Sequence, residues 1–153
     1  MVSKTLFSSD SAEWETPESL MNELRKEFNF TLDVCATVDN AKAPAFYTKV
    51  IDGLKQDWYT DGRGEACWMN PPYGRDIGQW IAKAGEEAQK GATVVCLLPA
   101  RTDTKYFHRY IWDAEAHRPR PGVGLRLLKG RLRFGGSKNS APFPSMVVVF
   151  KGG

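Results

Sequence analysis

The order of apolar patterns along the chain restricts its fold more than any other feature of its 153 residues. Stretches with helical spacing alternate with short apolar stretches typical of buried strands. The helical patterns cover 17–27 and 77–91, and the strand patterns cover 30–36, 66–69 and 93–98. This alternation is typical of α/β folds, in which helices pack on a mainly parallel sheet. Polar residues are expected to carry chemistry where those strands end, at 33–36, 70–73 and 99–104.

The C-terminal part of the chain has a different pattern. A short helix is expected over 103–112, and β-type patterning dominates 124–150, where Arg131-Leu132-Arg133-Phe134 alternates and Ser145–Phe150 is almost wholly apolar. We therefore predict a mixed, mostly parallel sheet with an antiparallel C-terminal part. The length favours one domain over 1–153, with a flexible N-terminus at 1–12 and no separate target-recognition domain.

Charge is distributed unevenly over the chain. The net charge of +3 results from −5 in residues 1–76 and +8 in residues 77–153. No acidic residue follows Glu115, whereas eight lysines and arginines do. The pattern indicates either a surface that binds a polyanion or simply a solvated basic surface.

Several protein classes are disfavoured by the sequence. The longest uncharged apolar runs, 94–98 and 146–150, are far shorter than the roughly 20 residues of a membrane-spanning helix. The cysteines Cys35, Cys67 and Cys96 lie far apart in apolar runs, without the paired spacing of metal sites. We predict reduced thiols, no metal, no membrane association and a cytoplasmic location, in a monomer or homodimer.

The most specific motif is Asn70-Pro71-Pro72-Tyr73, directly after the strand pattern at 66–69. Two prolines hold the backbone rigid and donate no N–H groups, so nearby carbonyls can act as acceptors. The Asn70 side chain adds a carbonyl oxygen, and together these groups suit a planar –NH2 group. Tyr73 offers a ring face for stacking. The alternative is a proline turn capped by a core tyrosine.

Such an acceptor pair has a chemical use. The lone pair of an adenine amine is delocalised into the ring, so the amine is a poor nucleophile. Hydrogen bonds to two carbonyl oxygens favour a localised lone pair and stabilise the positive charge that develops on nitrogen. The motif therefore predicts catalysis by Asn70, Pro71, Pro72 and Tyr73 without a strong base, and His108 and His117 are left out of the catalytic set.

The motif resembles that of amino-group methyltransferases that use S-adenosylmethionine. The whole motif order is similar to that of compact DNA N-6-adenine methyltransferases of bacteriophages and prophages. The similarity extends over Glu13–Pro17, Leu32–Ala36, Asn40–Lys42, Asp52–Leu54, Asp57–Trp58, Trp68–Gly74, Leu97–Thr104 and Gly130–Gly136. The resemblance implies a Rossmann-like S-adenosylmethionine-dependent methyltransferase fold.

The resemblance also implies a set of residues that bind the cofactor. They are Trp14, Thr16, Pro17, Asp33, Cys35, Ala36, Asp57 with Trp58, and Asp52. Thr16 and Pro17 can equally be the start of a helix, with Thr16 as its N-cap. Asp52 and Asp57 compete for one role, contact with the cofactor's adenine amine. The glycines usual under the cofactor are missing between Asp33 and Asp39.

For nucleic acid, the resemblance implies that Phe134 stacks on the target base opposite Tyr73, whereas the alternating pattern by itself favours a core strand residue. The alternation of Arg131 and Arg133 places both on one face, where they can contact phosphates. The further candidates are Arg75, Arg101 and Lys129.

Together these features predict a site-specific DNA adenine N-6 methyltransferase that transfers the methyl group of S-adenosylmethionine to a flipped-out adenine. The alternatives are methylation of RNA adenine or of a protein glutamine amide, and an inactive DNA-binding module. In a phage, the expected role is protection from host restriction.

Overall fold

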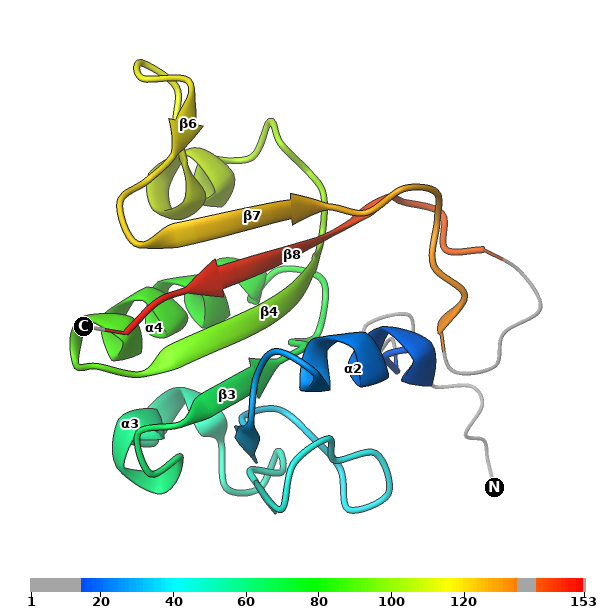
Figure 1. Ribbon diagram of the computed structural model, residues 1–153, viewed down its shortest axis with the longest axis vertical. Coiled ribbons are helices and arrows are strands. Elements are labelled where there is room, and N and C mark those ends of the chain that lie inside the picture. Colours follow the sequence, from blue (N-terminus) through cyan, green and yellow to red (C-terminus); the bar gives the residue numbers. More distant parts are fainter. Residues whose placement is uncertain (1–14, 135–139, 153) are drawn as a thin grey trace.

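The computed structural model describes residues 15–134 and 140–152 (Figure 1). Its main sheet has the order β2-β1-β3-β4-β8-β7, with strands at Ala45–Phe46, Phe30–Asp33, Ala66–Met69, Thr93–Pro99, Ser145–Phe150 and Val123–Leu127. The first four pair in parallel, and β8 is antiparallel to both β4 and β7. The predicted α/β fold, with a mostly parallel sheet and an antiparallel C-terminal part, is confirmed.

Helices cover both faces of this sheet. The helices are α2 (Glu18–Arg25), η1 (Gly53–Lys55), α3 (Trp58–Asp61), α4 (Ile77–Gln89) and the π-helical η2 (Phe107–Ile111). Helix α4 packs against β4 and β8 and lies behind the sheet in Figure 1, whereas α2 lies in front. A separate small hairpin joins β5 (Trp112–Asp113) to β6 (Arg118–Pro119).

The central strands account for the continuous apolar runs of the sequence. All four residues of β3 and all six of β8 are buried, as are six of the seven in β4. Strands covered on both faces cannot alternate between apolar and polar residues. In α4, by contrast, the apolar stripe predicted from helical spacing is the buried face and includes Trp80, Ile81 and Ala84.

Four local predictions are corrected. Helix α2 begins at Glu18 with Pro17 as its N-cap, and Thr16 does not cap it. Strand β1 ends at Asp33 rather than Ala36, and the expected helix over 103–112 contains a π-helix followed by β5. Residues 131–134 form no strand, and the Leu132 carbonyl oxygen accepts instead from the backbone N–H of Ala141 at 2.8 Å.

The chain order of the strands creates a switch point. After β1, the chain adds β2 on one side of it and then returns to place β3 on the other side. Segments leaving the carboxyl ends of β1 and β3 therefore diverge, and in open α/β sheets ligands bind in the crevice that results. Asp33 ends β1 and Asn70 follows β3, so both lie at this crevice.

Candidate active site at the carboxyl end of the sheet

A cavity of about 610 Å³ occupies the switch point between β1 and β3. Its walls come from residues 15–16, the segment after β1, the loop before η1, and the segment after β3. Cavities that hold drug-sized ligands have roughly 300–1,000 Å³. The space therefore suits a ligand of the size of a nucleoside cofactor.

Asn70 and Thr16 meet on one wall of this cavity. The Nδ2 atom of Asn70 donates a hydrogen bond to Oγ1 of Thr16 at 3.0 Å. Thr16 is only 3% exposed, and both residues line the cavity together with Pro72. Residues 54 positions apart in the chain thus form one polar contact at the site.

The other two motif residues are more deeply placed. Pro71 is buried and does not belong to the cavity lining. Tyr73 is also buried; its hydroxyl donates to the Leu97 carbonyl oxygen in β4 at 3.2 Å, and its ring meets Phe143 edge-on at 5.5 Å between centroids. Burial raises the pKa of the Tyr73 hydroxyl. Tyr73 therefore anchors the Asn-Pro-Pro-Tyr segment to the neighbouring strand. Stacking of a base on the Tyr73 ring stays a prediction.

Asp33 supplies a buried carboxylate at the end of β1. It is 2% exposed, and its two oxygens accept hydrogen bonds from the backbone N–H groups of Cys35 at 3.1 Å and Lys42 at 3.0 Å. Burial raises the pKa of the Asp33 carboxyl to about 7, against the lowering effect of those two bonds and of the Lys42 charge. The bonds orient the carboxylate, and burial makes its ionisation sensitive to a cationic ligand.

The structure brings together most of the predicted cofactor residues. Thr16, Asp33, Cys35, Ala36 and Asp52 line the cavity. Pro17 does not, although it follows Thr16 directly. Trp14 lies outside the described residues.

Asp52 and Asp57 have different environments. Asp52 lines the cavity and caps η1 through the backbone N–H of Leu54 at 3.2 Å. Asp57 is exposed, caps α3 by accepting from Thr60, and accepts a bond from Lys90 at 3.1 Å. The bonds from Thr60 and Lys90 together lower the pKa of the Asp57 carboxyl to about 2. Of the two competing carboxylates, only Asp52 is at the cavity.

Trp58 supports the cavity wall from behind. It is fully buried, its Nε1 donates to the Gly53 carbonyl oxygen at 2.8 Å, and its ring stacks on Trp80. Both Gly53 and Trp80 line the cavity. A Cβ atom at Gly53 would overlap the Val34 carbonyl oxygen, so this close approach of two backbone segments requires glycine.

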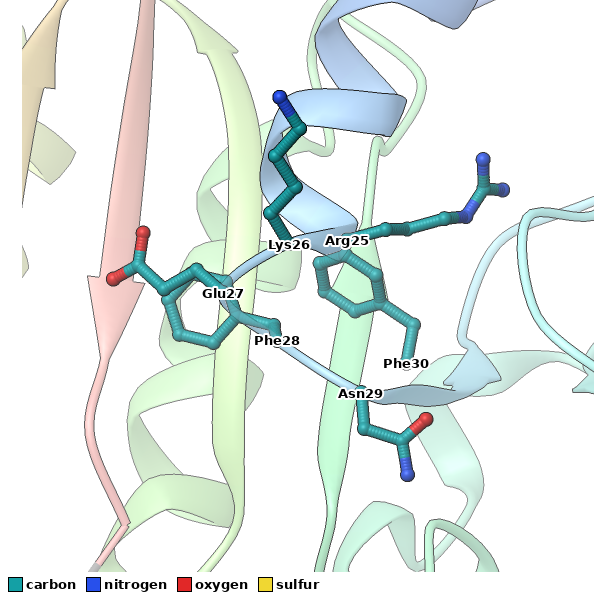
Figure 2. A pocket seen from close by; sticks show the side chains of 6 residues that line it. All are labelled: Arg25, Lys26, Glu27, Phe28, Asn29 and Phe30. Carbon is teal, nitrogen blue, oxygen red and sulfur yellow. The ribbon is translucent and has the colours of Figure 1, made fainter.

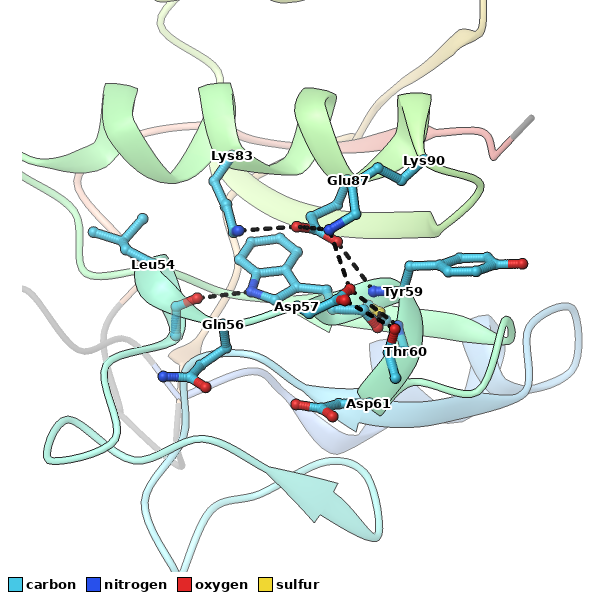
Figure 3. A network of polar contacts seen from close by, with 12 residues as sticks. Leu54, Gln56, Asp57, Tyr59, Thr60, Asp61, Lys83, Glu87 and Lys90 are labelled. Atoms are coloured by element: carbon cyan, nitrogen blue, oxygen red, sulfur yellow. Dashed lines mark hydrogen bonds and ion pairs between the residues drawn. The ribbon is translucent and has the colours of Figure 1, made fainter.

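A charged network joins α3 to α4 beneath this wall (Figure 3). The carboxylate of Glu87, 1% exposed, accepts bonds from the Tyr59 backbone N–H at 3.0 Å, Lys83 at 2.9 Å and Lys90 at 3.0 Å. Lys90 also binds Asp57. These lysine contacts hold the pKa of the Glu87 carboxyl below its ordinary value, although burial acts in the opposite direction more strongly than any single contact. Asp57 therefore belongs to a structural network.

Sequence reasoning missed several lining residues, among them Lys42, Lys49 and Trp80. Lys42 lies in the resembling segment 40–42 and pairs with Glu15 and Glu18 at 3.7 Å each. That motif position was a signal that could have identified Lys42. Trp80 belongs to the apolar stripe of α4, and its spacing gives no sign that one edge of it faces a cavity.

The predicted nucleic-acid residues lie mostly on the surface. Arg75, Arg101, Lys129, Arg131 and Arg133 are exposed. The Arg101 guanidinium lies over the Phe143 ring at 5.5 Å. Phe134 is 4% exposed and packs on Phe143 at 6.1 Å, so both Phe134 and Tyr73 contact this one ring.

Another hollow, of about 380 Å³, lies at the opposite end of β1 (Figure 2). It is lined by residues 25–30, which connect α2 to β1. Glu27 binds Arg126 through two hydrogen bonds of 2.8 and 2.6 Å, and the Arg126 guanidinium lies over Phe28. The hollow is remote from the carboxyl ends of the strands, so it is not the candidate site.

In residues 15–134 and 140–152, no cluster of three or more His, Cys, Asp and Glu residues is arranged to hold a metal ion. No helix there combines the length and the apolar character that spanning a bilayer demands. Cys67 and Cys96 are buried thiols that form no disulfide bond.

Comparison with known proteins assigns the family. The family model for DNA N-6-adenine-methyltransferase (Dam) matches residues 3–151. The chain is similar to the DNA N-6-adenine-methyltransferase of Haemophilus phage HP1 (strain HP1c1), at 32% identity over 117 residues, 75% of this chain and 65% of that protein. It also resembles YfdM of Escherichia coli (strain K12), at 35% identity over 65 residues, 40% of this chain and 70% of that protein. The matched region thus spans less than two thirds of the phage relative. The chain belongs to the DNA N-6-adenine-methyltransferase (Dam) family.

Proposed function

We propose that this chain transfers a methyl group from S-adenosylmethionine to the exocyclic N6 amine of adenine in DNA. The observation that carries the proposal is the cavity at the β1/β3 switch point, with Asn70 on its wall and the buried Asp33 carboxylate beside it. Family membership and the printed name of the phage HP1 relative support DNA adenine as the substrate.

The cavity residues fit S-adenosylmethionine. Asp33 offers a buried carboxylate to a cationic amino or sulfonium group. Leu54 and Trp80 supply apolar surface for a ring, and Asp52 supplies an acceptor for an amine. We therefore assign Asp33, Cys35, Ala36 and Asp52 to the cofactor. Trp14 and Pro17 remain candidates from the resemblance, whereas Asp57 and Trp58 would act only through the residues that they support.

The chain's own groups then act on the acceptor. When bound, S-adenosylmethionine supplies a methyl group whose bond to sulfur breaks, leaving the electron pair on sulfur, as the amine nitrogen forms its new bond to carbon. Oδ1 of Asn70 and the carbonyl oxygen of Pro71, which follows Asn70 but does not line the cavity, would accept hydrogen bonds from the amine, localise its lone pair and stabilise its positive charge. The proton that the nitrogen loses passes to water. Pro72 holds this segment rigid.

The base must leave the duplex to reach this cavity, and flipped bases are held by stacking on aromatic side chains. Tyr73 and Phe134 are the proposed aromatic partners, and both now pack on Phe143. Arg75, Arg101, Lys129, Arg131 and Arg133 are the proposed contacts to DNA. The proposed protein is a single catalytic domain that recognises its target through short loops. It acts in the cytoplasm as a monomer or homodimer.

The test is product analysis. The purified protein is incubated with S-adenosylmethionine and separate pools of unmethylated DNA, RNA and peptides, and the digests are examined by mass spectrometry. N6-methyladenine in the DNA digest is expected, and Asn70→Ala should abolish it while changing S-adenosylmethionine affinity little. The control is Asn29→Ala, an exposed asparagine outside the cavity. Methylation of RNA or of glutamine alone would overturn the DNA assignment, and near wild-type transfer by Asn70→Ala would overturn the role of Asn70.

A further inference from the structure

Thr16 is a buried hydroxyl with a use that the sequence patterns do not suggest. It precedes α2 and has the residue type of a helix cap, yet the N-cap is Pro17 and no side chain caps this helix. The side chain of Thr16 is therefore free of a role in the helix.

Instead, the hydroxyl of Thr16 faces Asn70. The Asn70 Nδ2 atom donates to Thr16 Oγ1 at 3.0 Å, and Thr16 is only 3% exposed. This partly buried hydrogen bond restricts rotation of the amide, because rotation would leave its donor without the Thr16 partner. Because the N–H edge of the Asn70 amide is turned towards Thr16, its carbonyl edge is turned away from Thr16.

We propose that Thr16 is a positioning residue for Asn70: its hydroxyl holds the amide so that the carbonyl oxygen points at the acceptor amine. The inference rests on the proposed methyl transfer and deepens it. An amide rotated by half a turn would present N–H groups to the amine, and two donors cannot bond. Thr16 thereby selects an –NH2 substrate, although it touches neither the amine nor the methyl group. This role differs from the direct cofactor contact that the resemblance implies.

The experiment compares Thr16→Val, which keeps the shape and removes the hydroxyl, with Thr16→Ser, which keeps the hydroxyl. For each variant, kcat and KM for DNA are measured, and the dissociation constant of S-adenosylmethionine is obtained by calorimetry. Thr16→Val should lower kcat roughly tenfold, about the equivalent of one hydrogen bond, and leave the dissociation constant within about twofold. Thr16→Ser should recover most of the lost turnover.

Two further measurements separate positioning from a general loss of structure. The Asn70 side-chain amide signals in 15N NMR should shift in Thr16→Val and return in Thr16→Ser, in cofactor-free protein. Thr31→Val is the matched control, because Thr31 donates to the Gly62 carbonyl oxygen at 2.6 Å and lies outside the cavity. It should reduce stability without changing kcat well below the unfolding temperature.

The outcomes are distinguishable from failure of the proposed function. If the wild type methylates no pool, the proposed function fails. If the wild type methylates DNA and Thr16→Val has an unchanged kcat, or weakens S-adenosylmethionine binding more than it lowers kcat, the positioning role is wrong.

Discussion

The affinity for S-adenosylmethionine should fall as the pH drops below 7. Asp33 is the buried carboxylate at the proposed cofactor site, and burial raises its pKa to about 7. A cationic amino or sulfonium group binds the ionised carboxylate and not the neutral acid. In the cofactor-free protein at acid pH, binding must therefore first remove the proton from Asp33.

The magnitude follows from the pKa. With a pKa of about 7, about half of Asp33 is ionised at pH 7 and about 1% at pH 5, so the dissociation constant should rise roughly 50-fold from about pH 7 to about pH 5. The measurements should stay below about pH 7.5, because an α-amino group such as that of the cofactor titrates near pH 8. Near pH 6, binding should release about one proton per cofactor.

Calorimetry at several pH values, in two buffers of different ionisation enthalpy, measures both affinity and proton release. Asp33→Asn should bind weakly and without this pH dependence. Asp52→Asn, which alters another cavity carboxylate, should retain it. A dissociation constant that is flat between about pH 5 and 7, or an equal slope in Asp33→Asn, would refute the reasoning.

The same pKa has a consequence for stability. In the window from 3.8, the ordinary value, to about 7, the folded protein keeps a proton on Asp33 that the unfolded chain has lost. The contribution of Asp33 to the free energy of unfolding therefore decreases as pH rises through this window, by up to about 1.4 kcal/mol per pH unit. Cofactor binding opposes this loss.

Two further predictions concern stability and DNA. Glu87→Gln removes the charge that two lysines share, so the free energy of unfolding, measured in urea, should fall by roughly 2–4 kcal/mol. Glu23→Gln, at an exposed ion pair, should change it by less than about 0.5 kcal/mol. Equal effects of the two substitutions would contradict the stabilising role of the network. DNA binding, measured by fluorescence anisotropy, should be weakened by Arg131→Ala and by Arg133→Ala whatever the DNA sequence. Each substitution should reduce the slope of the logarithm of the DNA-binding constant against the logarithm of the salt concentration by roughly 0.9. Unchanged slopes would show that neither arginine contacts a phosphate.

Local patterns predicted the elements that are buried on one or both faces. The strands β3 and β4 and the helix α4 were recognisable because burial dictates apolar residues at a fixed period. The Asn-Pro-Pro-Tyr motif was recognisable for a similar reason, since its chemistry needs these residue types in direct succession. Neither inference depended on contacts between distant segments.

Contacts across the fold decided the rest. Asp52 and Asp57 look alike in the sequence, and only the packing of α3 on α4 draws Asp57 to Lys90 and leaves Asp52 at the cavity. The ring face that Tyr73 is predicted to offer stays a prediction, whereas the backbone partner of its hydroxyl in β4 is a contact that only the fold supplies. The alternation of Arg131 and Arg133 predicted a strand, but their segment pairs with no strand of the described sheet, and Leu132 between them bonds to Ala141.

The sequence by itself determined the class of fold and the chemistry of one motif, because both are written in the spacing and type of adjacent residues. Only the tertiary structure decided which side chains share the cavity and how they are oriented. Thr16 is the clearest case: its neighbours in the chain predict a helix cap, and its partner is an asparagine 54 positions away. Hydrogen bonds between distant segments depend on the whole fold, which local patterns do not encode.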